Sequence, residues 1–220
     1  MRPAALIRFV FALALATLLA VPATADEVVR TIEDGRAAGA FTELYLDFPV
    51  GELQIEASDG DRVEWIIELE CDDDGWGSSS CPDRAERIAV EEELDGDRLE
   101  LTLEGYSKWR NRGLSVRMRM QVPEQLSLWV DMGIGELGIV GMRNDVTVDM
   151  GIGEASLRML ADDVGQVALD TGIGETSLRT PQGRLGSSGL FTSEVDWPGA
   201  TGEARVRVDL GIGEIDVRLQ

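Results

Sequence analysis

A short phrase that recurs along the second half of the chain constrains the fold more than any other feature. Each copy contains an Asp, the triplet Gly-Ile-Gly and a Glu, with alternating apolar and polar residues on both sides. The strict copies start at Asp131, Asp149, Asp170 and Asp209. An earlier version, LDFPVGELQI, occupies residues 46–55, and SSGLFTSEV from Ser187 is a degenerate copy. A period of about 20 residues is typical of a repeat architecture.

The alternation around each triplet predicts two short β-strands joined at a corner. Val146, Val148 and Met150 would face inward before one triplet, and Ala155 and Leu157 after it. Glycine permits the backbone angles of a corner. A unit this small cannot bury its own apolar face, so the copies are expected to stack as a single-chain β-solenoid. The corner isoleucines are expected to stack in register and extend the core: Ile134, Ile152, Ile173 and Ile212.

Residues 41–123 alternate in the same way without the full phrase. Leu44, Leu46 and Phe48 would face inward, and Asp95-Gly96-Asp97 has the composition of a hairpin turn. The expected fold class is therefore all-β: a β-solenoid, or β-helix, with rungs of about 20 residues and an irregular, disulfide-bearing N-terminal part.

The first 25 residues have the layout of a secretory signal peptide. Arg2 and Arg8 precede an apolar run, FVFALALATLLAV, and Ala23-Thr24-Ala25 resembles a cleavage site. The apolar run is shorter than the roughly 20 residues of a membrane-spanning helix. We therefore expect a cut after Ala25, no stable membrane insertion afterwards, and a periplasmic or secreted product. Residues 26–220 would form one solenoid domain, with the clearest repeats at 122–218.

The charge balance is strongly acidic. Without Arg2 and Arg8, 18 basic residues face 41 acidic ones, a net charge of −23. Phosphate binding needs clustered Lys and Arg, so this composition argues against nucleic acid as a partner.

The chain has only two cysteines, Cys71 and Cys81, which enclose the segment CDDDGWGSSSC. An oxidising compartment would join them in a disulfide. A zinc site is disfavoured because the chain has no histidine and no third cysteine.

The segment from Val122 onward, VPEQLSLWVDMGIGELGIVGMRNDVTVDMGIGEASL, resembles the bacterial secreted putative-adhesin family of β-solenoids, also called toastrack. It is similar as well to the solenoid domain of cell-envelope stress regulators. The resemblance implies a non-enzymatic role in the cell envelope. The family has small residues at the corner, whereas this chain has Ile and Glu.

The repeated acids would form two ladders if the copies stack about 4.8 Å apart. One ladder contains Asp131, Asp149, Asp170 and Asp209, and the other contains Glu136, Glu154, Glu175 and Glu214. Calcium suits such oxygen ligands, which makes a calcium-binding structural or adhesive solenoid an alternative. The competing interpretation is that the Asp residues bond corner amides, the Glu residues are solvated, and the outward arginines partly neutralise them: Arg158, Arg179 and Arg218.

A third interpretation of these acids is a glycan-cleaving enzyme with two carboxylates. Such a site needs one distinctive pair, whereas the same acids recur in every copy. No catalytic residues are therefore predicted, and no cofactor is expected unless calcium binds.

A basic, aromatic segment is the other candidate for binding. It contains Lys108, Trp109, Arg110 and Arg112, with Arg117 and Arg119 close by. Such a group suits an anionic glycan or an acidic protein surface. Alternatively, Arg117 and Arg119 pair across the sheet with Glu100 and Glu104, and Trp109 covers one end of the solenoid.

The last strand ends close to Gln220, so the final rung is expected to be exposed, and self-association through it is a hypothesis. Together these features predict a non-enzymatic binding or scaffolding module of the bacterial envelope, with an envelope protein or a glycan as partner.

Overall fold

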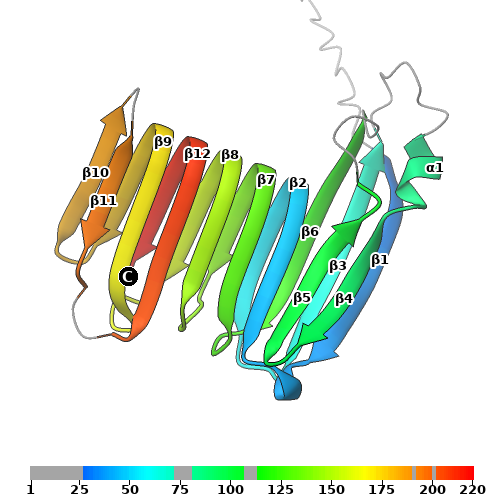
Figure 1. The fold of residues 1–220 in the computed structure, drawn as a ribbon, viewed down its shortest axis with the longest axis horizontal. Coiled ribbons are helices and arrows are strands. Elements are labelled where there is room, and N and C mark those ends of the chain that lie inside the picture. The colour runs from blue at the N-terminus through cyan, green and yellow to red at the C-terminus, as the bar shows by residue number, and fades with distance from the viewer. Residues whose placement is uncertain (1–26, 72–80, 107–112, 190–191, 200–201) are drawn as a thin grey trace, which may run out of the picture.

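The computed structural model describes residues 27–71, 81–106, 113–189, 192–199 and 202–220. This part of the chain is nearly all β, built into an open sheet of twelve strands (Figure 1). One α-helix, α1 (Cys81–Ala85), and one 3-10 turn, η1 (Ala38–Ala40), accompany them. The strands are β1 (Glu27–Ala37), β2 (Glu43–Ser58), β3 (Arg62–Cys71), β4 (Ala89–Asp95), β5 (Arg98–Glu104), β6 (Leu114–Pro123), β7 (Ser127–Val140), β8 (Val146–Met159), β9 (Val164–Thr180), β10 (Gly183–Gly189), β11 (Ser193–Trp197) and β12 (Ala204–Leu219).

Five strands carry the repeated phrase and pair in parallel, in the order β2, β7, β8, β12, β9. We call them the parallel stack. Their register aligns each copy with the next, so that Asp131 lies beside Asp149 and Ile134 beside Ile152. Because the phrase is the same in each strand, like residues line up across the stack, and β2 adds Asp47 and Glu52 to the two acid ladders.

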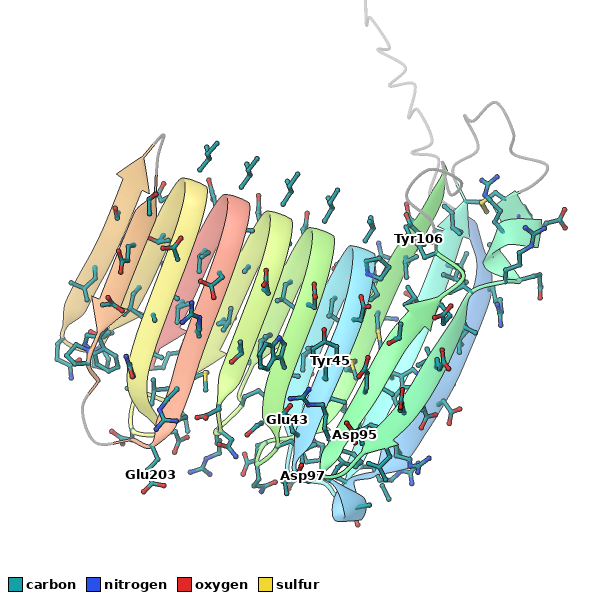
Figure 2. The ribbon with its side chains drawn as sticks, viewed as in Figure 1. Glu43, Tyr45, Asp95, Asp97, Tyr106 and Glu203 are labelled. Atoms are coloured by element: carbon teal, nitrogen blue, oxygen red, sulfur yellow. A yellow bond between two sulfur atoms is a disulfide. The ribbon has the colours of Figure 1, made fainter. Side chains whose placement is uncertain are left out.

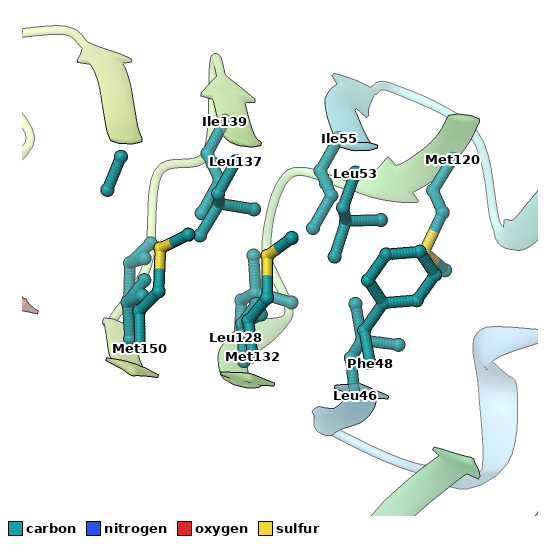
Figure 3. Packing of buried hydrophobic residues seen from close by; sticks show 14 of the residues in the cluster. Leu46, Phe48, Leu53, Ile55, Met120, Leu128, Met132, Leu137, Ile139 and Met150 are labelled. Atoms are coloured by element: carbon teal, nitrogen blue, oxygen red, sulfur yellow. The ribbon is translucent and has the colours of Figure 1, made fainter. Parts of the chain in front are cut away.

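Each strand of the parallel stack bends at its glycines into a first arm and a second arm. In β8 the inward residues are Val148 and Met150 before the bend and Ala155 and Leu157 after it, so the alternation changes phase at the bend. Figure 3 shows Leu128 and Met132 of one arm facing Leu137 and Ile139 of the other. The two arms thus enclose the apolar core between them.

The second glycine of each triplet is required by the bend. Gly153 has φ +147°, and a Cβ placed there would lie 1.8 Å from the carbonyl oxygen of Gly135 on the neighbouring strand. Only glycine fits a positive φ at such a close approach. In β2 the equivalent glycine is Gly51, with φ +139°. The first glycine of the triplet is replaced by Pro49 in β2, and in the other strands this first glycine does not have a positive φ.

Other strands cover both ends of the parallel stack. At one end, β5 pairs with the first arm of β2 and β6 with its second arm, and β4, β3 and β1 extend these pairings. At the other end, β10 and β11 pair antiparallel with the two arms of β9. The degenerate copy from Ser187 is therefore divided between β10 and β11, at the end of the stack and antiparallel to it.

The order of the strands corrects the expectation of an exposed final rung. β12 lies between β8 and β9 and is hydrogen-bonded on both sides. The chain inserts its last copy between two earlier ones. Both edges of β12 are therefore paired with neighbouring strands. Self-association through the C-terminal rung therefore loses its physical basis.

The corner isoleucines also differ from expectation. They stack in register, as predicted, but they point outward at the bend and are exposed by 38–46%: Ile134, Ile152, Ile173 and Ile212. The bend turns the chain, so the residue two positions after the last inward side chain of the first arm lies on the outside. The core therefore ends before the corner.

The predicted disulfide between Cys71 and Cys81 is confirmed, with the two Cα atoms 6.1 Å apart. The inward residues predicted for the N-terminal strands are confirmed as well, since Leu44, Leu46 and Phe48 are each at most 2% exposed. In the described ranges, no helix has the length and apolar character needed to cross a membrane.

Candidate binding face

The basic segment proposed from the sequence lies outside the described residues. This applies to Lys108, Trp109, Arg110 and Arg112. Its neighbours Arg117 and Arg119 on β6 are described and form ion pairs, as one interpretation expected, but with different partners. Arg117 contacts Glu52 at 2.9 Å and Glu70 at 2.6 Å.

Arg119 contacts Glu68 at 2.8 Å. The expected partners Glu100 and Glu104 belong to β5, which pairs with the first arm of β2, whereas β6 pairs with the second arm. The sequence alternation identified outward positions correctly but did not reveal which strand lies next to β6.

The two acid ladders exist as straight rows along the parallel stack. Asp131, Asp149, Asp170 and Asp209 align with one another on the first arms. Glu136, Glu154, Glu175 and Glu214 align on the second arms and are exposed. Among the residues that the structure describes, no group of three or more acids is arranged to hold a metal ion.

Among the residues that the structure describes, arginines neutralise the Glu ladder only at its ends. Arg117 pairs with Glu52 at one end, and Arg184 lies 3.8 Å from Glu175 at the other. Arg218 and Arg179 contact Asp216 instead, at 2.6 and 3.5 Å. Within the described ranges the three central members have no ion pair: Glu136, Glu154 and Glu214.

Within the described part of the chain, the Asp ladder is neutralised at one position. Arg207 donates to Asp209 at 2.6 Å, and this contact raises the pKa of its guanidinium. In the described part of the chain none of the four repeated Asp residues accepts a hydrogen bond from a corner amide, contrary to one interpretation. A hollow of about 150 Å³ lies beside Arg207, bordered by Asp170 and Glu194.

An aromatic patch occupies the outer face of the first arms near the β2 end of the stack. It consists of Tyr45 on β2, Trp129 on β7 and Arg98 on β5 (Figure 2 labels Tyr45). The two rings lie 6.2 Å apart at 48°, and Trp129 is 40% exposed. The Arg98 guanidinium lies 5.7 Å from the Tyr45 ring and 5.8 Å from the Trp129 ring.

Arg98 is held in place by an ion pair with Glu43, which neutralises its charge. The guanidinium lies within cation–π distance of both rings, and these contacts restrain the orientation of the rings. Because these contacts restrict the side chains before any ligand arrives, the aromatic patch is preorganised for binding.

Carboxylates surround the aromatic patch. Burial raises the pKa of the Tyr45 hydroxyl, and the negative charges of Asp131, Asp47 and Glu100 raise it further. Burial likewise raises the pKa of Asp47, together with the negative charge of Asp131. The face thus offers flat apolar rings beside several hydrogen-bond acceptors.

Sequence reasoning missed the aromatic patch, although a signal was present. Tyr45 and Trp129 both stand two positions before the repeated Asp, where the other copies have Thr147, Ala168 and Arg207. Comparing the copies column by column would have shown that the outward position is aromatic in two adjacent strands. The contribution of Arg98 could not be found this way, because β5 is outside the repeats.

Comparisons with known proteins give matches among solved structures. Neither the known family models nor the curated proteins include a match. Among solved structures, a putative cell adhesion protein from Clostridium sporogenes matches with 15% identity and a TM-score of 0.49, over 87% of this chain and 100% of that one. A putative adhesin from Parabacteroides merdae matches with 10% identity and a TM-score of 0.25, over 86% and 96%.

A putative lipid binding protein from Parabacteroides distasonis matches with 9% identity and a TM-score of 0.24, over 84% of this chain and 96% of that one. The descriptions of these three structures concern adhesion and lipid binding.

Proposed function

We propose that this protein is a non-enzymatic binding module that holds a neutral or amine-bearing glycan on its aromatic patch. The observation that carries this proposal is Trp129, 40% exposed beside Tyr45 on a flat sheet face. A large exposed ring costs free energy in water unless a ligand covers it. A sugar ring presents an apolar C–H face to such a ring.

The carboxylates beside the patch select the class of sugar. Asp47, Asp131 and Glu100 accept hydrogen bonds from hydroxyl or ammonium groups. They repel carboxylated or phosphorylated sugars, since the charge of Arg98 is already neutralised by Glu43. The hollow beside Arg207 lies on the same outer face, several strands away, and gives a longer glycan a second contact.

We place the protein in the bacterial periplasm or outside the cell, with residues 1–25 removed and one domain formed by residues 26–220. The sequence pattern of the first 25 residues supports this location. The disulfide between Cys71 and Cys81 supports it too, because such bonds persist in oxidising compartments.

We also infer that the parallel stack is a short β-solenoid, with each bent strand as one rung. The in-register pairing of the five copies supports this inference. A repetitive scaffold of this kind presents the same residue positions at regular spacing and leaves the chemistry to the few positions that differ between copies, such as Trp129.

An array of immobilised neutral, acidic and amine-bearing oligosaccharides tests this proposal. Labelled wild-type protein should bind neutral or amine-bearing members, Trp129→Ala should lose them, and Trp129→Phe should keep them because an aromatic face remains. Binding of acidic members alone, or the same set bound by Trp129→Ala, would overturn the proposal.

A further inference from the structure

We propose that the bend of the parallel stack is a second binding surface, which docks a basic amphipathic helix of a partner protein. The surface is a row of branched aliphatic residues, here called the isoleucine ridge: Val50, Ile134, Ile152, Ile212 and Ile173. The four isoleucines are exposed by 38–46%. Figure 2 shows aliphatic side chains projecting in a row beyond the bends of these strands.

The ridge is continuous, which distinguishes it from the ordinary scatter of exposed apolar residues. Adjacent strands lie about 4.8 Å apart, so five aligned residues form a line of roughly 19 Å. Single exposed aliphatic residues need no explanation, whereas a contiguous apolar surface rimmed by polar residues marks an interaction site. Glycines on both sides of each isoleucine leave its side chain uncovered by neighbours in the sequence.

The acid ladders decide which partner fits. The Glu ladder runs along one side of the ridge and the Asp ladder along the other, each two or three residues from the isoleucine. The central residues Glu136, Glu154 and Glu214 have no ion pair among the described residues. A partner must therefore combine an apolar stripe with positive charge on both flanks of that stripe.

A helix meets this requirement and an extended strand does not. In an amphipathic helix, the residues that border the apolar stripe project sideways, toward both ladders. In a strand, polar residues that alternate with apolar ones point to the opposite face, away from the carboxylates. A line of roughly 19 Å corresponds to about 13 helical residues.

The same charges disfavour two other occupants. A second copy of this chain, with 41 acidic residues against 20 basic ones, would bring its own carboxylate ladders to the contact. An anionic membrane surface would be repelled in the same way.

The test uses a synthetic helical peptide of about 14 residues with a leucine stripe flanked by lysine, and its counterpart with glutamate in place of lysine. Binding to the full mature chain is measured by fluorescence anisotropy. Wild type should bind the lysine peptide and not the glutamate peptide. The triple variant Ile134→Ser/Ile152→Ser/Ile212→Ser should weaken binding about tenfold or more.

Two further variants make the test specific. Leu160→Ser removes an aliphatic residue that is 51% exposed but lies outside the ridge, and it should change the affinity less than about twofold. Glu154→Gln/Glu214→Gln should weaken binding and reduce its sensitivity to salt. Circular dichroism checks that each variant is folded.

Three results would overturn the proposal. The first is equal binding of the lysine peptide by wild type and the isoleucine triple variant, which would mean that charge alone holds it. The second is binding of neutral phosphatidylcholine vesicles that the triple variant abolishes, which would assign the ridge to lipid. The third is a wild-type dimer in analytical ultracentrifugation that the triple variant dissociates.

Discussion

The same repeat produces two rows of apolar side chains with opposite fates. Met132 and Met150 align inside the bend and are 1% exposed, whereas Ile134 and Ile152, two positions later, align outside it and are 38% and 45% exposed. Both rows consist of apolar side chains. The difference comes from the bend at the glycines, which shows that backbone geometry rather than side-chain character decides which repeated apolar residue enters the core.

The largest effect should come from removing the bend itself. Gly153→Val would place a side chain against the carbonyl of Gly135 at a positive φ, so we expect the free energy of unfolding to fall by at least about 4 kcal/mol. Gly96→Val is the control, because Gly96 has φ +63° with nothing within 4 Å, and should cost about 1–2 kcal/mol. Equal losses in urea denaturation would show that steric contact between strands is unimportant.

A smaller effect should separate the inside of the bend from the outside. Leu157→Ala removes a fully buried side chain and should lower the free energy of unfolding by about 3 kcal/mol. Ile152→Ala, on the isoleucine ridge, should change it by less than about 0.5 kcal/mol. Similar losses for the two variants would mean that the ridge belongs to the core.

The smallest effect concerns the charge on the outer face. Because the pKa of Asp47 is raised in the folded state, the folded protein binds a proton more tightly than the unfolded chain does. The contribution of this residue to stability should therefore decrease as the pH rises from its ordinary pKa of 3.8 through the raised value.

Asp47→Asn removes this titration. The difference in stability between the variant and wild type should therefore be slightly more favourable to the variant at pH 7 than near pH 3.5. Chemical denaturation at both pH values measures the difference. A variant that is destabilised at pH 7 would indicate that the Asp47 carboxylate makes a favourable contact. Glu33→Gln, on β1 away from the ladders, is a suitable control.

Much of this fold could be predicted from the sequence because the physics involved is local. Period-2 alternation identified the inward residues of β2 and β8, and the repeated phrase predicted in-register stacking. The disulfide followed from having only two cysteines. These features depend on neighbours in the chain or on copies of the same phrase.

The features that were missed depend on contacts between different segments. Nothing local indicates that β12 enters between β8 and β9, or that Arg98 of β5 reaches Tyr45 and Trp129. The outward turn of Ile152 depends on how the glycines bend the chain, which alternation alone does not specify. The candidate site was therefore missed even though its strands were predicted.

The most direct test of the proposed function is a proton–nitrogen spectrum of the tryptophan indoles. The chain has five tryptophans, and the spectra of Trp65→Phe, Trp109→Phe and Trp129→Phe assign the signals of these three residues. Neutral or amine-bearing oligosaccharides released from bacterial envelopes are then added to wild type. The proposal predicts that the Trp129 signal shifts while the signal of buried Trp65 does not. Movement of the Trp109 signal alone would contradict the proposal and favour the basic segment as the binding site. Movement of no signal would contradict the proposal as well.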